Sequence, residues 1–116
     1  MFSFLLKQHI RQPAEFDAVF KQGKRFYKGC FTLIFLNTER DYPRLGILIG
    51  KRYCRLAVGR NRIKRLVRES FRRHQQALSG KDIVVMLRSP VEIVNNQEQR
   101  EWLEQLFLQC AASASS

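Results

Sequence analysis

The side chains best suited to chemistry in this sequence are the cations between Gly59 and Phe71, where charged and apolar residues interleave at helical spacing. At about 100° per residue, one side of a helix carries Ile63, Leu66, Val67, Ser70, Phe71 and His74. The opposite side carries Asn61, Arg62, Lys64, Arg65, Arg68, Arg72 and Arg73. The first side is expected to pack on a core. The second is expected to meet a polyanion, which relieves the mutual repulsion of so many cations.

The distribution of charge favours a nucleic acid as that polyanion. The 116-residue chain has a net charge of +11, and residues 51–75 hold ten Lys and Arg side chains against a single acid. Arg outnumbers Lys there, and guanidinium groups bind phosphate bidentately and stack on bases, which suits folded RNA. The apolar content of 45% supports a compact core, so a disordered basic tail is excluded for most of the chain.

A second group of residues combines aromatic rings with further cations. Phe16 and Phe20 lie one helical turn apart, and Phe31 belongs to an apolar strand whose side chains alternate between two faces. One interpretation makes the rings simple core. The other makes them a partly open groove where unstacked bases lie on aromatic faces, with phosphates held by Lys51, Arg52 and Arg88.

Patterns typical of a protein-borne catalytic site are missing. The acids are scattered, the two histidines are far apart, and no metal-ligand spacing occurs, so we expect no catalytic residue, no metal site and no cofactor bound by the protein alone. Cys30, Cys54 and Cys110 are odd in number and widely spaced, which indicates packing residues in a reducing compartment. No signal-peptide pattern or membrane-length apolar run is present, so a cytoplasmic location without membrane contact is expected.

The predicted elements of the first half are a helix, two strands and their connections. Pro13 suits the first turn of a helix that Gly23 ends. Residues 30–36 read as a strand, residues 37–43 as a turn, and residues 45–49 as a second strand paired with the first in a hairpin. Residues 50–55 form a basic connection.

The second half is expected to hold two helices around one buried strand. A long helix is predicted from Leu56 to Leu78, closed by Ser79-Gly80. The apolar run 82–87 is typical of a strand buried on both faces. Asn96 and Gln99 resemble a capping box for a last helix whose apolar residues are Trp102, Leu103, Leu106, Phe107 and Cys110.

These elements predict one α+β domain over residues 1–116, with an ordered core at about 9–110 and a frayed tail at 111–116. The strand 45–49, the long helix and the strand 82–87 form a β-α-β unit. Its default hand is right-handed.

The basic segment also resembles a known family. Arg60-Asn61-Arg62-x-Lys64-Arg65-x-x-Arg68-Glu69-x-Phe71 is similar to the "RNR" signature of the bacterial ribonuclease P protein subunit. The surroundings over roughly residues 9–90 fall in family order: Phe16-x-x-x-Phe20-x-x-Gly23, the strand with Phe31, Arg44-Leu-Gly46, Lys51-Arg52 and Asp82-Ile-Val-Val.

This resemblance implies a fold and a function. The implied fold is a two-layer α/β sandwich like ribosomal protein S5 domain 2, with a small mixed sheet, three helices and a left-handed β-α-β crossover that replaces the default hand. The implied enzyme removes the 5′ leader from precursor tRNA, with catalysis by an RNA subunit that uses Mg²⁺. The protein is then a monomer within the ribonucleoprotein, and its partners are that RNA and precursor tRNA.

The resemblance also implies roles for individual residues. The surface for the RNA subunit comprises Arg60, Asn61, Arg62, Lys64, Arg65, Arg68 and the adjoining Arg72. The leader-binding cleft comprises Phe16, Phe20, Phe31, Lys51, Arg52 and Arg88. Three departures from the family pattern, Ser89 after Arg88, Ile34 on the cleft strand and His9-Ile10 near the start, predict fewer leader contacts than in relatives.

Three other functions are compatible with parts of the sequence. A ribosomal or RNA-chaperone protein would share the charge and the fold, but the RNR spacing argues against it. A protein-only nuclease would need a carboxylate cluster. A membrane-surface helix would need a free apolar side, which here is required to cover the sheet.

Overall fold

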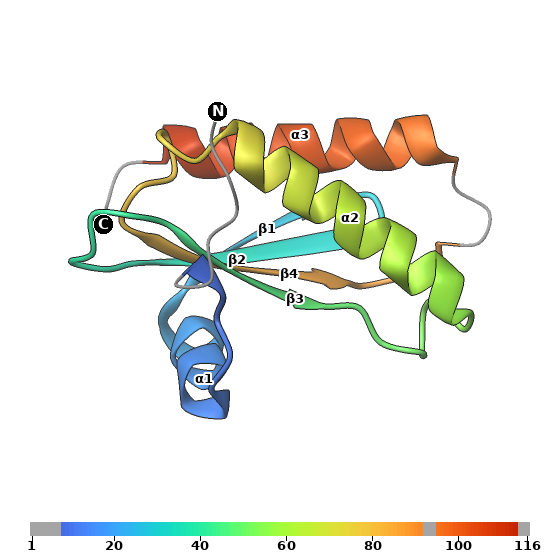
Figure 1. The fold of residues 1–116 in the computed structure, drawn as a ribbon, viewed down its shortest axis with the longest axis horizontal. Helices are drawn as coiled ribbons and strands as arrows, with labels where there is room; N and C mark the ends of the chain where they lie inside the picture. Colours follow the sequence, from blue (N-terminus) through green and yellow to red (C-terminus); the bar gives the residue numbers. More distant parts are fainter. Residues whose placement is uncertain (1–7, 92–94, 114–116) are drawn as a thin grey trace.

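The computed structural model describes residues 8–91 and 95–113 as three helices on a four-stranded sheet (Figure 1). The elements, in chain order, are α1 (Pro13–Gln22), β1 (Lys24–Lys28), β2 (Phe31–Asn37), β3 (Arg44–Leu48), α2 (Ala57–Arg73), β4 (Lys81–Leu87) and α3 (Asn96–Ala112). The predicted α+β class, the mixed sheet and the three helices are confirmed. Within the described residues, no helix is long and apolar enough to span a membrane.

The sheet has the strand order β1-β2-β4-β3, so β4 lies between the two strands that were expected to pair. The predicted hairpin of residues 30–36 with 45–49 is therefore wrong. β2 pairs antiparallel with β1 and β4, and β3 pairs parallel with β4. The hairpin partner of β2 is β1, which the prediction missed because Lys24–Lys28 is polar and mostly exposed.

The unit of β3, α2 and β4 has the left-handed crossover that the resemblance implied. In Figure 1 both strands run from left to right, α2 lies above them, and β3 lies nearer the viewer than β4. The helix passes from the front strand over the sheet to the strand behind it, which defines a left-handed turn. The usual preference for the right-handed connection does not hold here.

Two cores lie on opposite faces of the sheet. On one face, α2 and α3 cover the alternate residues Phe31, Leu33 and Phe35 of β2, together with Ile83 and Val85 of β4. On the other face, Val19 of α1 packs with Ile34 and Val84, and the rings of Phe16 and Phe20 pack against them. Figure 1 shows α1 on the opposite side of the sheet from α2 and α3, so the main two-layer core carries α1 as a smaller layer behind it.

The helix ends differ from the predicted ones by a few residues. α2 ends at Arg73, because residues 74–80 form turns and Gly80 takes a positive φ of 80° that leads the chain into β4. The cap of α3 is Asn95, whose side chain accepts a hydrogen bond from the Glu98 backbone N–H at 2.8 Å, one residue before the predicted pair. α3 continues through Ala112, so two residues of the predicted tail are helical, and 114–116 lie outside the described residues.

Trp102 of α3 explains why the β1–β2 turn uses a glycine. Gly29 has a φ of 55°, and a Cβ at this position would lie 2.3 Å from the indole ring of Trp102. A side chain would therefore meet both the strained backbone conformation and the ring. The three cysteines are free and buried, as predicted. Burial raises the pKa of the Cys30 thiol to about 11 and that of the Cys110 thiol to about 12.

Candidate RNA interface

Helix α2 has the two sides that its sequence predicted. Ile63, Leu66, Val67, Ser70 and Phe71 are buried. On the opposite side, Asn61, Arg62, Arg65, Arg68 and Arg72 are exposed and Lys64 is half-buried. The first turn carries no acidic residue, so the positive end of the helix dipole adds to the positive potential at the beginning of the helix. We call Asn61, Arg62, Lys64, Arg65, Arg68 and Arg72 the cationic face.

Arg60 differs from the rest of the predicted RNA-subunit surface because part of its guanidinium serves the protein itself. Its Nη1 donates hydrogen bonds to the backbone carbonyls of Cys54 at 3.0 Å and Arg55 at 2.7 Å. These bonds hold the connection from β3 against the first turn of α2. Arg60 therefore has a structural role that the motif did not reveal, alongside any contact with RNA made by its remaining donors.

The other end of α2 is tied to α3 by Glu104. Its carboxylate lies 2.8 Å from His74 Nε2 and accepts hydrogen bonds from Ser70 Oγ at 3.1 Å and Arg73 Nη2 at 3.4 Å. Burial alone would raise the pKa of Glu104, but the hydrogen bond and charge of His74 and the bond from Ser70 bring it below its ordinary value. Arg73 is thus ion-paired, and the cationic face ends at Arg72.

On the far side of the sheet, Phe16 and Phe20 stand side by side on α1. Their ring centroids lie 6.4 Å apart, and both rings are half-buried against Ile34 and Val84. The ring of Phe16 lies over Gly46 of β3, where a Cβ would approach it to 2.5 Å. Each ring thus packs against the smaller core with one part and leaves another part at the surface, where the stacking of bases stays a prediction.

The predicted place of Phe31 in the leader cleft is wrong. Its side chain is fully buried in the core under α2 and α3, on the opposite face of the sheet from Phe16 and Phe20. The reason is the two-residue alternation of a strand, which puts Phe31 on the same side as Leu33 and Phe35 and turns Ile34 toward α1.

Lys51, Arg52 and Arg88 are all exposed and follow the ends of two parallel strands. Lys51 and Arg52 come after β3, and Arg88 comes after β4. Because these strands are parallel, all three cations lie beyond the same end of the sheet, where the two strands finish. The guanidinium of Arg88 lies 4.9 Å from the ring centroid of Tyr27 on β1, and that of Arg52 lies 5.1 Å from the ring centroid of Tyr53.

Two residues beside α1 escaped the sequence analysis. The strand registers place Tyr27, Thr32, Met86 and Leu48 in one row across the sheet, next to the row that α1 covers. Tyr27 is 55% exposed and Leu48 is 38% exposed, at the two ends of that row. Tyr27 offers an aromatic surface beside Arg88, and it could have been found only by recognising β1 as a strand.

A buried ion network attaches α1 to the sheet. The Arg44 guanidinium donates to Asp82 through Nε at 2.9 Å and Nη2 at 2.8 Å, and to Glu15 of α1 through Nη1 at 2.6 Å. Arg40 adds a longer contact to Asp82 at 3.3 Å. The hydrogen bond from Arg44 lowers the pKa of Glu15, and the bonds to Asp82 raise the pKa of Arg44. The network orients the helix that carries Phe16 and Phe20.

A pocket of about 170 Å³ brings together residues from both predicted surfaces around the edge strand β3. Lys64 and Arg68 of the cationic face meet Phe16 of α1 and His9 there. Burial lowers the pKa of His9, and the charges of Arg11 and Arg68 lower it further. A polyanion that lies along β3 at this pocket could contact both the cationic face and α1.

The carboxylates of the described ranges 8–91 and 95–113 do not assemble a metal site. No three His, Cys, Asp or Glu side chains in those ranges gather closely enough to hold a metal ion. Glu15 and Asp82 are instead bound by Arg44, and Glu104 is bound by Arg73 and His74 at the end of α2.

Comparison with known proteins gives one consistent result. The family model described as Ribonuclease P matches residues 4–111. The ribonuclease P protein component of Nitrosococcus oceani is 38% identical, over 97% of this chain and 98% of its own. That of Nitrosomonas europaea is 41% identical, over 88% and 86% respectively.

Solved structures agree with the sequence relatives. The RNase P protein of Staphylococcus aureus superposes with a TM-score of 0.80 at 33% identity, covering 90% of this chain and 95% of its own. The RNase P protein of Thermotoga maritima has a TM-score of 0.74 at 35% identity, covering 87% and 96%. The RNR motif lies on the exposed side of α2, and the sequence relatives and the solved structures agree over nearly the whole chain. This chain therefore belongs to the ribonuclease P protein family.

Proposed function

We propose that this protein binds the catalytic RNA of ribonuclease P through the cationic face of α2 and the 5′ leader of precursor tRNA beside α1. Membership of the family establishes a role in tRNA 5′ processing as a ribonuclease P subunit. The observation that carries the finer proposal is the exposure of the cationic face, because five of its six side chains are free to reach phosphates. The ribosomal alternative is not favoured by the family.

In this proposal the protein positions substrates and the RNA performs the cleavage. Arg62, Arg65 and Arg68 neutralise phosphates of the RNA subunit, and their planar groups favour bidentate contacts. Phe16 and Phe20 offer ring surface to unpaired leader bases, while Lys51, Arg52 and Arg88 hold the leader phosphates. The RNA would hold the Mg²⁺, which would supply an activated nucleophile and charge neutralisation there. We expect one protein molecule in each ribonucleoprotein and a cytoplasmic location.

The test begins with the RNA that co-purifies with the protein. Sequencing should return one abundant structured RNA rather than ribosomal RNA, and that RNA should remove the leader from a precursor tRNA. Adding the protein should increase the rate at low Mg²⁺, where phosphate repulsion is strongest. Site-specific 5′ maturation by RNA-free protein, or co-purification of ribosomal RNA alone, would refute the proposal.

A further inference from the structure

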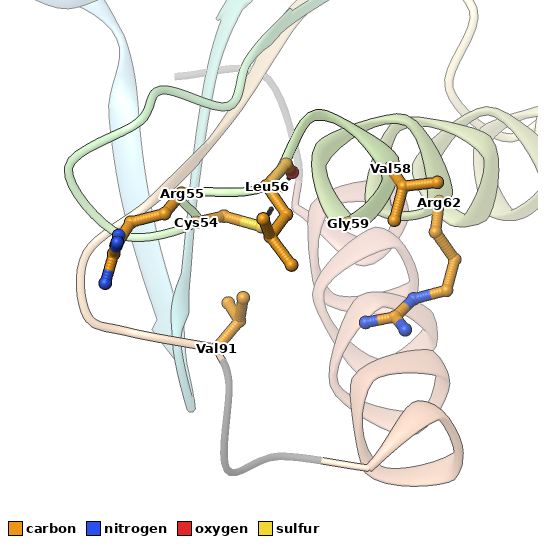
Figure 2. A pocket seen from close by; sticks show the side chains of 7 residues that line it. All are labelled: Cys54, Arg55, Leu56, Val58, Gly59, Arg62 and Val91. Carbon is orange, nitrogen blue, oxygen red and sulfur yellow. Dashed lines mark hydrogen bonds between the residues drawn. The ribbon is translucent and has the colours of Figure 1, made fainter.

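A pocket at the beginning of α2 is lined by Arg62 of the cationic face and by residues that have no role in the function described so far. Its volume is about 500 Å³, within the range of sites that hold small ligands, about 300–1,000 Å³. Figure 2 shows it between the connection from β3, the first turns of α2 and Val91, which follows β4. The pocket therefore adjoins the end of α2 at which the cationic face begins.

The walls of this pocket are apolar side chains that the fold does not need to bury. Leu56 is 72% exposed and Val58 is 77% exposed, although both flank or begin the helix that carries the cationic face. In Figure 2 the side chain of Leu56 extends toward Val91. Exposed aliphatic side chains that line a cavity are typical of a contact surface.

The floor of the pocket is formed where Gly59 faces Cys54. A Cβ at Gly59 would lie 3.0 Å from Cys54 Sγ, so the absence of a side chain lets the helix and the connection approach closely. The hydrogen bonds from Arg60 to the carbonyls of Cys54 and Arg55 hold this arrangement. The pocket is therefore shaped in the protein before any partner binds.

The charges around the pocket select the kind of partner. Arg55 and Arg62 lie at its two ends, and none of the described residues that line it is acidic. The first turn of α2 also lacks an acid, so the positive end of its dipole is unopposed. A group that suits this place has a flat, weakly polar body for the apolar walls and a negative charge on each side for the guanidinium groups. An unstacked nucleotide has that chemistry.

We propose that this pocket takes one unstacked base of the ribonuclease P RNA, with Leu56 and Val58 against the base and Arg55 and Arg62 on the flanking phosphates. The inference rests on the proposed function and adds a place where the protein contacts a base instead of the backbone alone. An apolar contact of this kind adds affinity without neutralising a phosphate, so it should not contribute to the salt dependence of binding.

The test replaces the two exposed apolar side chains that line the pocket and keeps every charged residue. The double variant Leu56→Ser/Val58→Ser should bind ribonuclease P RNA about tenfold more weakly, as expected when a partly covered apolar side chain is lost from an interface. The slope of log K against log salt should equal that of the wild type. Leu108→Ser on α3, where the leucine is 51% exposed, is the matched control and should leave affinity unchanged.

A second measurement uses the unaltered protein. The methyl NMR signals of Leu56 and Val58 should shift when ribonuclease P RNA is added, and adenosine monophosphate at high concentration should shift the same signals and leave those of Leu108 in place. The proposal of a nucleobase pocket would be overturned if the double variant bound the RNA with wild-type affinity. It would also be overturned if the methyl signals of Leu56 and Val58 did not shift when the RNA was added. If the wild-type protein itself does not bind that RNA, the proposed function fails, which is a separate result.

Discussion

The three exposed arginines of the cationic face should account for a measurable share of the salt dependence of RNA binding. Arg62, Arg65 and Arg68 are exposed, and no ion pair or hydrogen bond within the described residues occupies their guanidinium groups. Each phosphate contact contributes about 0.7–0.9 to the slope of log K against log salt. The triple alanine variant should therefore have a slope flatter by about 2.1–2.7. Raising the salt concentration from about 50 to 200 mM should then weaken its RNA binding by a factor about 20- to 40-fold smaller than for wild type.

Arg60 belongs to the same sequence motif but should behave differently. Its Nη1 bonds to the carbonyls of Cys54 and Arg55 stabilise the folded protein by about 1–2 kcal/mol, a typical value for hydrogen bonds from a charged donor at a partly exposed site. Arg60→Ala should lower the melting temperature by several degrees. Its salt slope should change less than that of any single variant among the other three arginines.

The assay is filter binding of labelled ribonuclease P RNA over a series of salt concentrations, with a thermal melt of each variant. Arg100→Ala removes an exposed cation from α3 and should change neither the slope nor the melt. The reasoning fails if the triple variant keeps the wild-type slope. It also fails if Arg60→Ala flattens the slope like Arg62→Ala while its melting temperature is unchanged.

Three further perturbations probe α1 and its attachment to the sheet. Phe20→Ala should reduce affinity for leader-bearing precursor tRNA by about 1–3 kcal/mol, the worth of one base–aromatic stack, and barely affect mature tRNA; an identical difference between the two tRNAs in wild type and variant would make the ring purely core. Gly46→Ala should displace the ring of Phe16, because the new Cβ would lie 2.5 Å from it, so both the melting temperature and the preference for leader-bearing tRNA should fall; an unchanged melt would contradict the close approach. Glu15→Gln should destabilise the protein at neutral pH, since the hydrogen bond from Arg44 holds the pKa of Glu15 below its ordinary 4.5. That stabilisation is present above the unfolded-state pKa and is lost as pH falls through the folded-state pKa, so urea melts of wild type and variant should converge in acid, and a constant difference at all pH values would refute the assignment.

Helices and strands with a clear pattern of apolar residues could be predicted from the sequence. The interleaved pattern of residues 59–71 identified both sides of α2, and the apolar run 82–87 identified the doubly buried β4. Both signals survive folding because one side of α2 and both faces of β4 are needed by the core. The resemblance to the family supplied the left-handed crossover, which no local pattern encodes.

The remaining features depend on contacts between distant parts of the chain. β1 has a polar sequence and becomes a strand because β2 offers it a partner. The buried network joins Glu15, Arg44 and Asp82, which lie in three separate elements, so no spacing in the sequence indicates it. Assigning Phe31 to the cleft failed because the sequence does not say which face of β2 meets α1. The role of Arg60 was hidden for a related reason, since its partners are backbone carbonyls that any residue supplies.

The central position of β4 determines the order in which the sheet can form during synthesis. While the chain is being synthesised, β3 and α2 leave the ribosome before the strand on which β3 must pair. Only the β1–β2 hairpin and single helices can form from local contacts before then, because the rest of the sheet closes through residues far apart in the chain. A nascent chain that stops before Leu87 therefore displays the arginines of α2 on an unsupported helix. Selective binding of RNA must await the synthesis of β4, and until then the growing chain can offer RNA only non-specific electrostatic attraction.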